Sequence, residues 1–409
     1  MELMTTIHLL PESPTINLLM VMCIVWTAGV LFRKIKQPPV LGELLAGIIF
    51  GPCLLNIIHP DPTLDVLAEL GAFFLMFYAG LETNPFDLQR MGRLSFMVGF
   101  GGFIVPFIMG YLVCHFFFDT TVIQSMFIGL GLSVTAIAVN ARVLNDMCLQ
   151  RYRVTPVIIG ASIVDDVLCF ALFSAIIELA TLKDHFHWLT MGHNLIKVLV
   201  FFALTIWIGL HIFPRLSRYF SGREAKGFTF ALIMALLFGL MAEVSGLHII
   251  IGAYMAGLFV REGIVHKDLY QKINDRFVSI TYGFLGPIFF VSLAFHMNFN
   301  IFFEHAGFIG LLLLVAIIGK MGGAMIGTSL GKMSLKESMV VACAMNGRGA
   351  VELVIASVGI KLGVIDDVLF SILVVIAFLT TLFPPLSLGF LLRRGKEGLQ
   401  LIDPNAKHC

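Results

Sequence analysis

The stretch GASIVDDVL at residues 160–168 governs how the whole chain is interpreted, because it places two adjacent carboxylates inside a long apolar run. That run extends over 154–181, so Asp165 lies about eleven residues, or about 16 Å of helix, from its start. An acidic side chain at this depth is costly if the run crosses a membrane, and such residues are usually functional. Asp165 and Asp166 therefore predict a buried functional site.

The composition indicates a polytopic membrane protein. Of the 409 residues, 58% are hydrophobic and 13% are charged, whereas soluble domains carry about 45–50% and about 25%. The 27 basic and 26 acidic residues nearly cancel, which excludes a basic nucleic-acid-binding protein. The seven cysteines include no Cys-x-x-Cys pair, so neither disulfides nor zinc are expected.

Charged residues and Pro/Gly positions divide the sequence into thirteen predicted membrane spans in an all-α fold. The spans lie at 16–33, 40–57, 64–81, 94–117, 122–146, 154–181, 193–214, 226–246, 248–262, 276–297, 304–330, 337–360 and 365–392. Most of the 27 basic residues then fall on one side of the membrane, as the positive-inside rule requires. We therefore expect a multi-pass membrane protein, in contact with lipid, with its N-terminus outside and its C-terminus in the cytoplasm.

Lys320 is predicted to be the fixed partner of one of the two aspartates. It lies more than a dozen residues into the span 304–330, beside glycines that allow helices to approach closely. Neighbouring helical residues point about 100° apart, so one aspartate can face Lys320 while the other faces a water-filled cavity. A purely structural ion pair is an alternative, and it is compatible with transport.

The same dipeptide recurs as Asp366-Asp367, but at the start of the span 365–392. Free backbone amides and the helix dipole favour carboxylates at a helix N-terminus. Depth in the span therefore predicts helix capping for this second pair and function for the first.

Two spans contain polar interruptions that predict broken helices. The span 122–146 holds Thr135 and Asn140, and the span 337–360 holds Asn346 before a Gly-Arg-Gly sequence. Irregular backbone is tolerated in a membrane only where it lines protein or a cavity. Discontinuous helices in related positions are typical of inverted-repeat transporters with a site near the midplane.

Arg348 and Glu352 are four residues apart, so we expect them to pair on one helix face. The sequence leaves two roles open for this pair, structural support of the broken helix and direct contact with an ion.

The order and spacing of several motifs resemble the monovalent cation:proton antiporters of the second cation:proton antiporter superfamily, over nearly the whole chain. The motifs are QPPVLGELLAG at 37–47, GP at 51–52, LGA at 70–72, AGLE at 79–82, DD at 165–166, IGAYMAGL at 251–258, PIFFV at 287–291, GK at 319–320 and GRG at 347–349. Bacterial Na⁺/H⁺ exchangers belong to this group, and so do glutathione-gated K⁺ efflux systems, which often carry a regulatory nucleotide-binding domain. We expect no such domain here, but a single transmembrane antiporter domain over 1–409.

The resemblance implies a homodimer in a bacterial inner membrane and elevator-like alternating access. Each protomer would have a mobile core around the spans 94–181 and 276–360, with inverted repeats and two crossed discontinuous helices. The remaining spans would form the dimerisation part.

The resemblance also implies roles for single residues. Asp166 would bind the cation or the proton, Asp165 would pair with Lys320, and Thr135 would belong to the ion site. Thr135 and Asn140 match polar positions of the broken helix, less securely than the two aspartates match theirs. An Asp-Asp pair is generally linked to electrogenic exchange, and no cofactor is implied.

We therefore expect a secondary antiporter with a role in pH homeostasis, not an enzyme, in which a monovalent cation and protons compete for Asp166. Na⁺ is the expected cation, with K⁺ and Li⁺ as alternatives. A gated K⁺ efflux channel or a sodium-coupled solute symporter on a similar fold remains open. An intramembrane aspartyl protease is disfavoured, since it needs aspartates on two separate helices.

Overall fold

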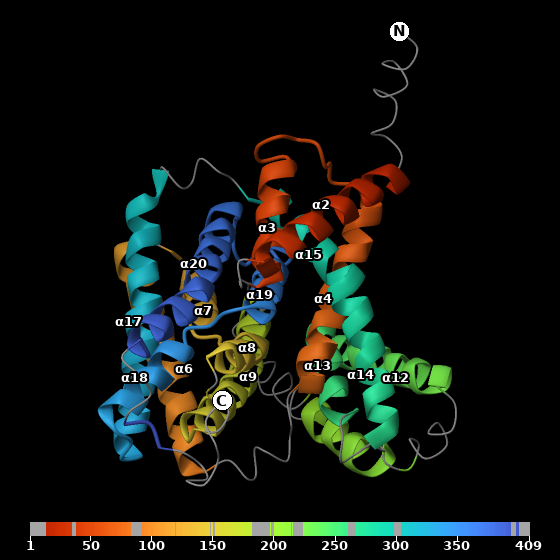
Figure 1. The fold of residues 1–409 in the computed structure, drawn as a ribbon. Coiled ribbons are helices and arrows are strands. Elements are labelled where there is room, and N and C mark those ends of the chain that lie inside the picture. The colour runs from red at the N-terminus through yellow and green to blue at the C-terminus, as the bar shows by residue number, and fades with distance from the viewer. Residues whose placement is uncertain are drawn as a thin grey trace. The chain divides into compact units, whose positions relative to one another are not determined.

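The computed structural model describes residues 14–34, 38–82, 92–118, 120–147, 149, 152–181, 197, 200–213, 215, 224–260, 267–297, 304–393 and 398–400. These residues form helices joined by short turns and contain no β-strand (Figure 1). The predicted all-α class is therefore confirmed for the part of the chain that the structure describes.

Eight of the described helices are long and apolar enough to cross a membrane. They are Pro14–Lys34, Pro62–Glu82, Arg93–Phe117, Val154–Ala180, Gly227–Val244, Ile273–Phe295, Ala306–Leu330 and Asp367–Leu391. Shorter apolar helices at Pro39–Phe50, Val122–Gly131, Val200–Ile212 and Ile249–Phe259 coincide with further predicted spans. A multi-pass membrane protein follows, whereas the number thirteen remains a prediction.

The chain divides into two compact units, Met1–Leu81 with Trp188–Phe299 and Glu82–His187 with Asn300–Cys409. Helices of the first unit are α2 (Pro14–Lys34), α3 (Pro39–Phe50), α4 (Pro62–Glu82), η2 (Ile208–Ile212), α12 (Glu224–Val244), α13 (Ile249–Phe259), α14 (Lys267–Ile280), η3 (Thr281–Leu285) and α15 (Gly286–Phe295). Helices of the second unit are α6 (Arg93–Phe117), α7 (Val122–Gly131), α8 (Ile137–Asp146), α9 (Val154–Thr181), α17 (Ala306–Leu330), α18 (Leu335–Ala344), α19 (Ala350–Lys361) and α20 (Asp367–Leu391).

In the first unit, α4 packs closely on the helix that runs from α14 through the π-helical turn η3 into α15. A Cβ atom added at Gly71 of α4 would lie 2.5 Å from the carbonyl oxygen of Leu285. The turn between the predicted spans 226–246 and 248–262 is tight, and in it Gly246 has a φ of 81°. That conformation favours glycine, and it lets α13 follow α12 directly.

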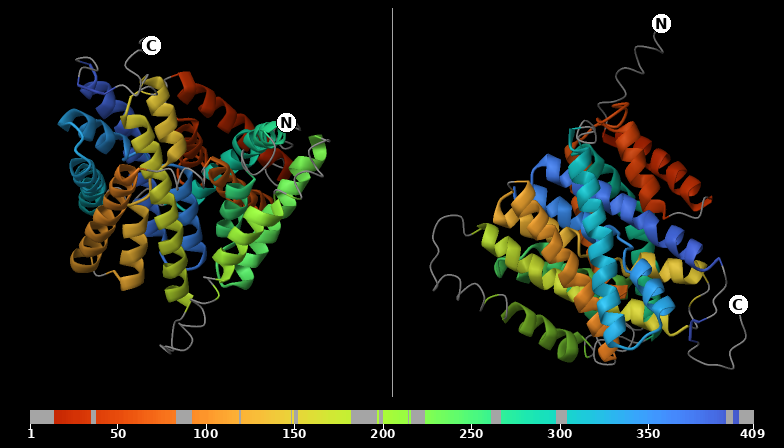
Figure 2. Two further views of the ribbon diagram at one scale, coloured as in Figure 1. Left: turned by 90° about the horizontal axis from the view of Figure 1, so that it is seen from below. Right: turned by 90° about the vertical axis from the view of Figure 1, so that its left-hand side faces the viewer.

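In the second unit, α6 and α17 lie side by side (Figure 2), and glycines line the contact between them. A Cβ atom at Gly101 would lie 2.5 Å from the carbonyl oxygen of Gly323, and one at Gly327 would lie 2.6 Å from that of Met97. Only hydrogen atoms fit between the two backbones at these points, so the glycines set the distance between α6 and α17.

Both polar interruptions are breaks between two short helices. The chain leaves α7 at Gly131 and enters α8 at Ile137, and it leaves α18 at Ala344 and enters α19 at Ala350. The two non-helical segments meet, since the backbone amide of Ala136 donates to the carbonyl oxygen of Gly347 over 2.8 Å. Backbone groups freed by one break are thus satisfied in part by the other.

The second Asp-Asp pair caps a helix, which confirms the prediction. Asp366 precedes α20, and its carboxylate oxygen Oδ1 accepts a hydrogen bond of 2.8 Å from the backbone amide of Leu369. This geometry is that of an N-cap residue.

Asp61 plays a similar role before α4, and it also links α4 to α2 through a hydrogen bond. Its Oδ1 accepts from the amides of Thr63 and Leu64 over 2.7 and 3.1 Å, while its Oδ2 accepts from the side-chain amide of Asn17 over 2.7 Å. Partial burial acts to raise the pKa of Asp61, but these hydrogen bonds outweigh it and hold that pKa below its ordinary value.

We expect Asp61→Ala to lower the free energy of unfolding by about 1 kcal/mol at neutral pH, because the α4 cap and the contact with α2 are lost. A lowered folded-state pKa stabilises the protein above the unfolded-state pKa of about 3.9, and this contribution is lost as the pH falls through the folded-state value. Thermal unfolding in detergent at stepwise lower pH should therefore show the wild type and the variant converging. Asp65→Ala, which removes an exposed carboxylate from the same helix turn, serves as the control. A pH-independent difference would contradict this account.

Candidate functional site

A buried ion pair stands at the centre of the second unit. Asp165 on α9 is 0% exposed and Lys320 on α17 is 1% exposed, and the Lys320 Nζ lies 2.5 Å from the Asp165 Oδ2. Lys320 also donates to the backbone carbonyl of Ser133 in the α7–α8 break. The ammonium group therefore connects three elements, and its charge is balanced by Asp165.

Thr135 joins the same ion pair from the middle of the first break. Its hydroxyl oxygen lies within hydrogen-bond distance of the Asp165 Oδ2 and 3.1 Å from the carbonyl oxygen of Met345 in the second break. A hydroxyl group has one proton to donate, so it serves one of these two acceptors at a time. Thr135 thus links the carboxylate to both broken helices.

Asp166 lies next to this pair but is not part of it. It is 2% exposed, and its Oδ1 has no hydrogen-bond partner among the described residues. The Oδ1 of Asp165 is likewise buried and without a partner in the described part of the chain. Two open carboxylate oxygens on consecutive residues make a site at which a proton, a cation or water can be held.

Asn140 reaches the same helix face one turn before Asp166. Its side-chain amide donates to the hydroxyl oxygen of Ser162 over 2.9 Å, and Ser162 precedes Asp166 by four residues on α9. The amide oxygen of Asn140 is buried and unpaired within the described residues. This oxygen is a neutral acceptor of the kind that dehydrated alkali cations bind.

Asn346 lies in the second break, after Met345. Its side-chain amide donates to the carbonyl oxygen of Ala342 over 2.9 Å, and its own amide oxygen is buried without a partner among the described residues. Gly347 follows directly, and a Cβ atom there would lie 2.8 Å from the Asn140 Oδ1. Asn140 on α8 therefore lies against the second break, beside the residue that follows Asn346.

Arg348, which lies in the second break, binds the backbone of the first break. Its Nη2 donates to the carbonyl oxygen of Leu132 over 2.5 Å and its Nη1 to that of Gly131, where α7 has just ended. The Nη1 also pairs with the Oε1 of Glu352 over 3.0 Å, and both side chains are 1% exposed. The guanidinium group thus satisfies carbonyls that a helix C-terminus leaves unpaired.

The sequence left two roles open for Arg348 and Glu352, and these contacts favour structural support. The expected pairing at four-residue spacing is confirmed. All eight residues singled out from the sequence lie in the second unit, and Thr135, Asp165 and Lys320 are in direct contact.

Three features of the site were not identified from the sequence. They are the backbone carbonyl of Ser133, the backbone carbonyl of Met345 and the hydroxyl of Ser162. Backbone groups carry no side-chain signal, so nothing in the sequence distinguishes these two carbonyls. Ser162 could have been found, because its four-residue spacing places it on the same helix face as Asp166.

We expect Lys320→Gln to destabilise the protein by about 3–5 kcal/mol, since it leaves the Asp165 charge buried without its partner. The double variant Asp165→Asn/Lys320→Gln should lose less than the sum of the single variants, by about 0.5–3 kcal/mol. Thermal unfolding in detergent measures the stability of the wild type, the two single variants and the double variant, which together form a double-mutant cycle. Lys332→Gln, an exposed substitution just after α17, is the control. Strictly additive losses would show that the two side chains are not energetically coupled.

Arg348→Lys should also be destabilising, although it preserves the charge. One ammonium group cannot reproduce the planar fork that serves two carbonyls and a carboxylate. We expect a loss of about 1–3 kcal/mol, the cost of leaving a buried polar group unpaired. Hydrogen exchange should at the same time increase at the end of α7. Unchanged unfolding and exchange would refute the proposed capping role.

The chain matches the family model described as "Sodium/hydrogen exchanger, transmembrane" over residues 19–394. Among curated relatives, the Na⁺/H⁺-K⁺ antiporter GerN of Bacillus cereus is 30% identical over 360 residues, covering 88% of this chain and 91% of the relative. The Na⁺/H⁺ antiporter of Enterococcus hirae is 28% identical over 365 residues, covering 88% and 94%.

The fold is similar to that of the sodium proton antiporter MjNhaP1 from Methanocaldococcus jannaschii, whose structure at pH 8 matches with a TM-score of 0.67. The match covers 96% of this chain and 98% of the other at 18% sequence identity, so it bears on the fold alone. The family match, by contrast, extends over parts of both units and includes all eight residues singled out from the sequence. The chain therefore belongs to the sodium/hydrogen exchanger family of membrane transporters.

Proposed function

We propose that this protein is a secondary antiporter that exchanges a monovalent cation, Na⁺ in the first place, for protons at Asp166. The observation that carries the proposal is the unequal state of the two adjacent aspartates. Asp165 is paired with Lys320, whereas Asp166 is also buried but forms no ion pair with any of the described residues. The relatives named as Na⁺/H⁺ antiporters support the same reaction.

Competition at one carboxylate supplies the coupling. A bare charge on Asp166 is disfavoured in so apolar a setting, so the carboxylate is stable when it holds either a proton or a cation. The two occupants exclude each other, because each neutralises the same charge. If the site changes sides only when it is occupied, cation movement one way is tied to proton movement the other way.

The oxygen atoms near Asp166 are suitable ligands for an alkali cation. Carboxylate oxygens of Asp165 and Asp166 and the amide oxygen of Asn140 are buried acceptors without partners in the described residues, and Thr135 adds a hydroxyl oxygen. Hard cations of this kind take oxygen ligands. The K⁺ in the name of GerN belongs to that relative, and for this chain we propose K⁺ and Li⁺ as secondary substrates.

We further propose that exchange is electrogenic and that the site alternates between the two faces of the membrane by an elevator-like movement in a homodimer. The compact second unit contains every site residue, which is suited to movement of the site as one body. A second proton could be exchanged at the Asp165–Lys320 pair, if this pair opens when the cation enters.

The test is a proteoliposome assay with an imposed ΔpH and Na⁺, K⁺ or Li⁺ added in turn. We expect Asp166→Asn to reduce cation-driven proton movement to the level of protein-free vesicles, since the amide cannot exchange a proton for a cation. Asp366→Asn is the matched control, because it makes the same change in the helix-capping Asp-Asp pair and asparagine caps equally well. Normal exchange by Asp166→Asn would refute the proposal.

The same assay separates the alternatives. Cation flux without proton flux would indicate a channel, and dependence on an organic solute would indicate a symporter. Clamping the membrane potential with valinomycin and K⁺ tests electrogenicity, since only a charge-moving exchange is accelerated by the clamp.

A further inference from the structure

Residues 398–400 form a short segment that binds across the beginnings of two helices of the second unit; we call it the strap. The backbone amide of Arg153, just before α9, donates to the carbonyl oxygen of Gln400 over 2.9 Å. The backbone amide of Gln400 donates in turn to the Oε1 of Glu337 in the first turn of α18 over 3.1 Å. Gln400 therefore bridges the N-terminal ends of α9 and α18 through its own backbone.

Glu337 is fully buried and uses both of its carboxylate oxygens. Oε2 accepts from the backbone amide of Ser334 over 3.1 Å and completes the capping box of α18, while Oε1 accepts from the strap. The hydroxyl of Ser334 donates to the carbonyl oxygen of Gly398 over 3.3 Å. Gly398 has a φ of 86°, which gives the strap a turn that other residues rarely adopt.

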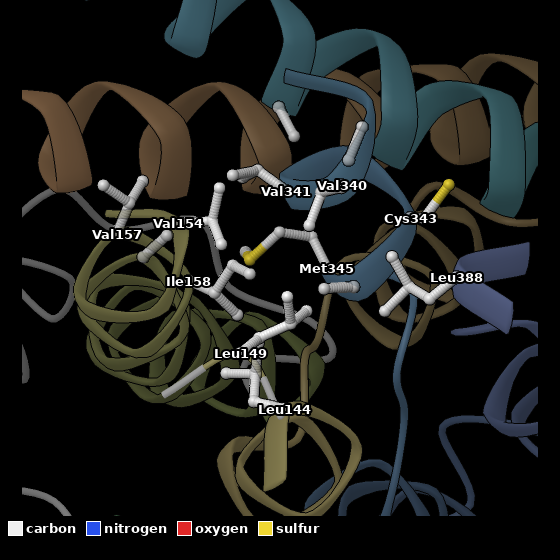
Figure 3. Close-up of a cluster of buried hydrophobic side chains, with 14 of the residues drawn as sticks. Leu144, Leu149, Val154, Val157, Ile158, Val340, Val341, Cys343, Met345 and Leu388 are labelled. Atoms are coloured by element: carbon white, nitrogen blue, oxygen red, sulfur yellow. The ribbon is translucent and has the colours of Figure 1, made fainter. Parts of the chain in front are cut away.

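Leu399 anchors the strap in the apolar interior. It is 9% exposed and belongs to a cluster of packed buried side chains that includes Leu149, Leu388 and Met345 (Figure 3). Backbone hydrogen bonds on both sides and an apolar side chain in a pocket are the features by which proteins bind extended peptides. The described ends of α9 and α18 thus provide a peptide-binding cradle, occupied by the strap.

Met345 connects this cluster to the ion site. Figure 3 shows its side chain in the middle of the cluster, pointing toward Ile158 of α9. Its sulfur lies 3.9 Å from the Ser162 hydroxyl, and its carbonyl oxygen is the second acceptor of Thr135. A displacement of the cluster therefore moves the Met345 carbonyl, which competes with Asp165 for the hydroxyl proton of Thr135.

We propose that the docked strap controls the geometry of the ion site through Met345, so that release of the strap lowers the apparent cation affinity. This inference deepens the function proposed above and rests on it. With the strap docked, α9 and α18 are held together where they begin, and Thr135 is kept between Met345 and Asp165. With the strap released, the α18–α19 break is free to shift, and the Thr135 contact to Asp165 is weakened.

Two variants release the strap, and one matched variant does not. Gln400→Pro removes the amide that donates to Glu337, whereas Gln400→Ala keeps that amide and loses only an exposed side-chain contact with Arg153. Leu399→Asp places a charge in the buried apolar cluster. None of the three changes touches a residue of the ion site.

The first measurement is hydrogen–deuterium exchange by mass spectrometry on the full chain, which does not depend on transport. We expect Gln400→Pro and Leu399→Asp to accelerate exchange at 344–349 and 133–136, and Gln400→Ala to match the wild type. Faster exchange confined to the strap and the starts of α9 and α18 would overturn the proposal. So would a uniform increase over 304–393, which would indicate general destabilisation.

The second measurement is Na⁺-dependent proton movement in proteoliposomes. The two release variants should raise the Na⁺ concentration for half-maximal exchange by about 2- to 30-fold, the usual range for residues that act on a site through packed neighbours. Their pH profile should shift as well, while Gln400→Ala keeps wild-type values. A loss of maximal rate with unchanged affinity and pH profile would show a structural role only, and would overturn the proposal.

The two proposals fail in different ways. If the wild type shows no exchange of any cation, the proposed function fails, while hydrogen exchange still reports whether the strap controls the breaks. If the wild type exchanges Na⁺ and the release variants match it in both measurements, the strap has no such role.

Discussion

The ion pair between Asp165 and Lys320 is the interaction on which the rest of the site depends. Transferring either charge into so apolar an interior costs several kcal/mol, and pairing offsets this only with good geometry and further hydrogen bonds. Here the Ser133 carbonyl accepts from Lys320, and the Thr135 hydroxyl reaches Asp165. With Asp165 paired in this way, Asp166 is left as the buried carboxylate that has no ion-pair partner among the described residues, and for this reason we propose it as the exchange site.

The two helix breaks make this arrangement possible, because they free backbone carbonyls that a continuous helix would use in its own hydrogen bonds. An unsatisfied backbone group inside a membrane is costly. Each break therefore depends on the other: Gly347 accepts from the amide of Ala136, and Arg348 binds the carbonyls that end α7.

Much of this could be predicted from the sequence, because charges in apolar runs are rare and conspicuous. The helical class, the capping by Asp366 and the pairing of Arg348 with Glu352 follow from depth and spacing. The choice of Asp165 as the partner of Lys320 came from resemblance to a family. The carbonyls of Ser133 and Met345 could not be predicted, since every residue has one and only the fold selects which is used. The number of spans depends on segments beyond the described residues.

The glycine contact between α6 and α17 has a consequence for how this protein can change during evolution. Gly323 lies three residues from Lys320 on α17, and its backbone leaves no room for a methyl group against Gly101. Even an alanine at position 323 would push α17, which carries the Lys320 ammonium group, away from α6, although it alters no charge. Substitutions along this line of glycines are therefore limited by the volume of the new side chain and not by its polarity. Variants that look conservative by chemistry can be as damaging there as the loss of a charged residue.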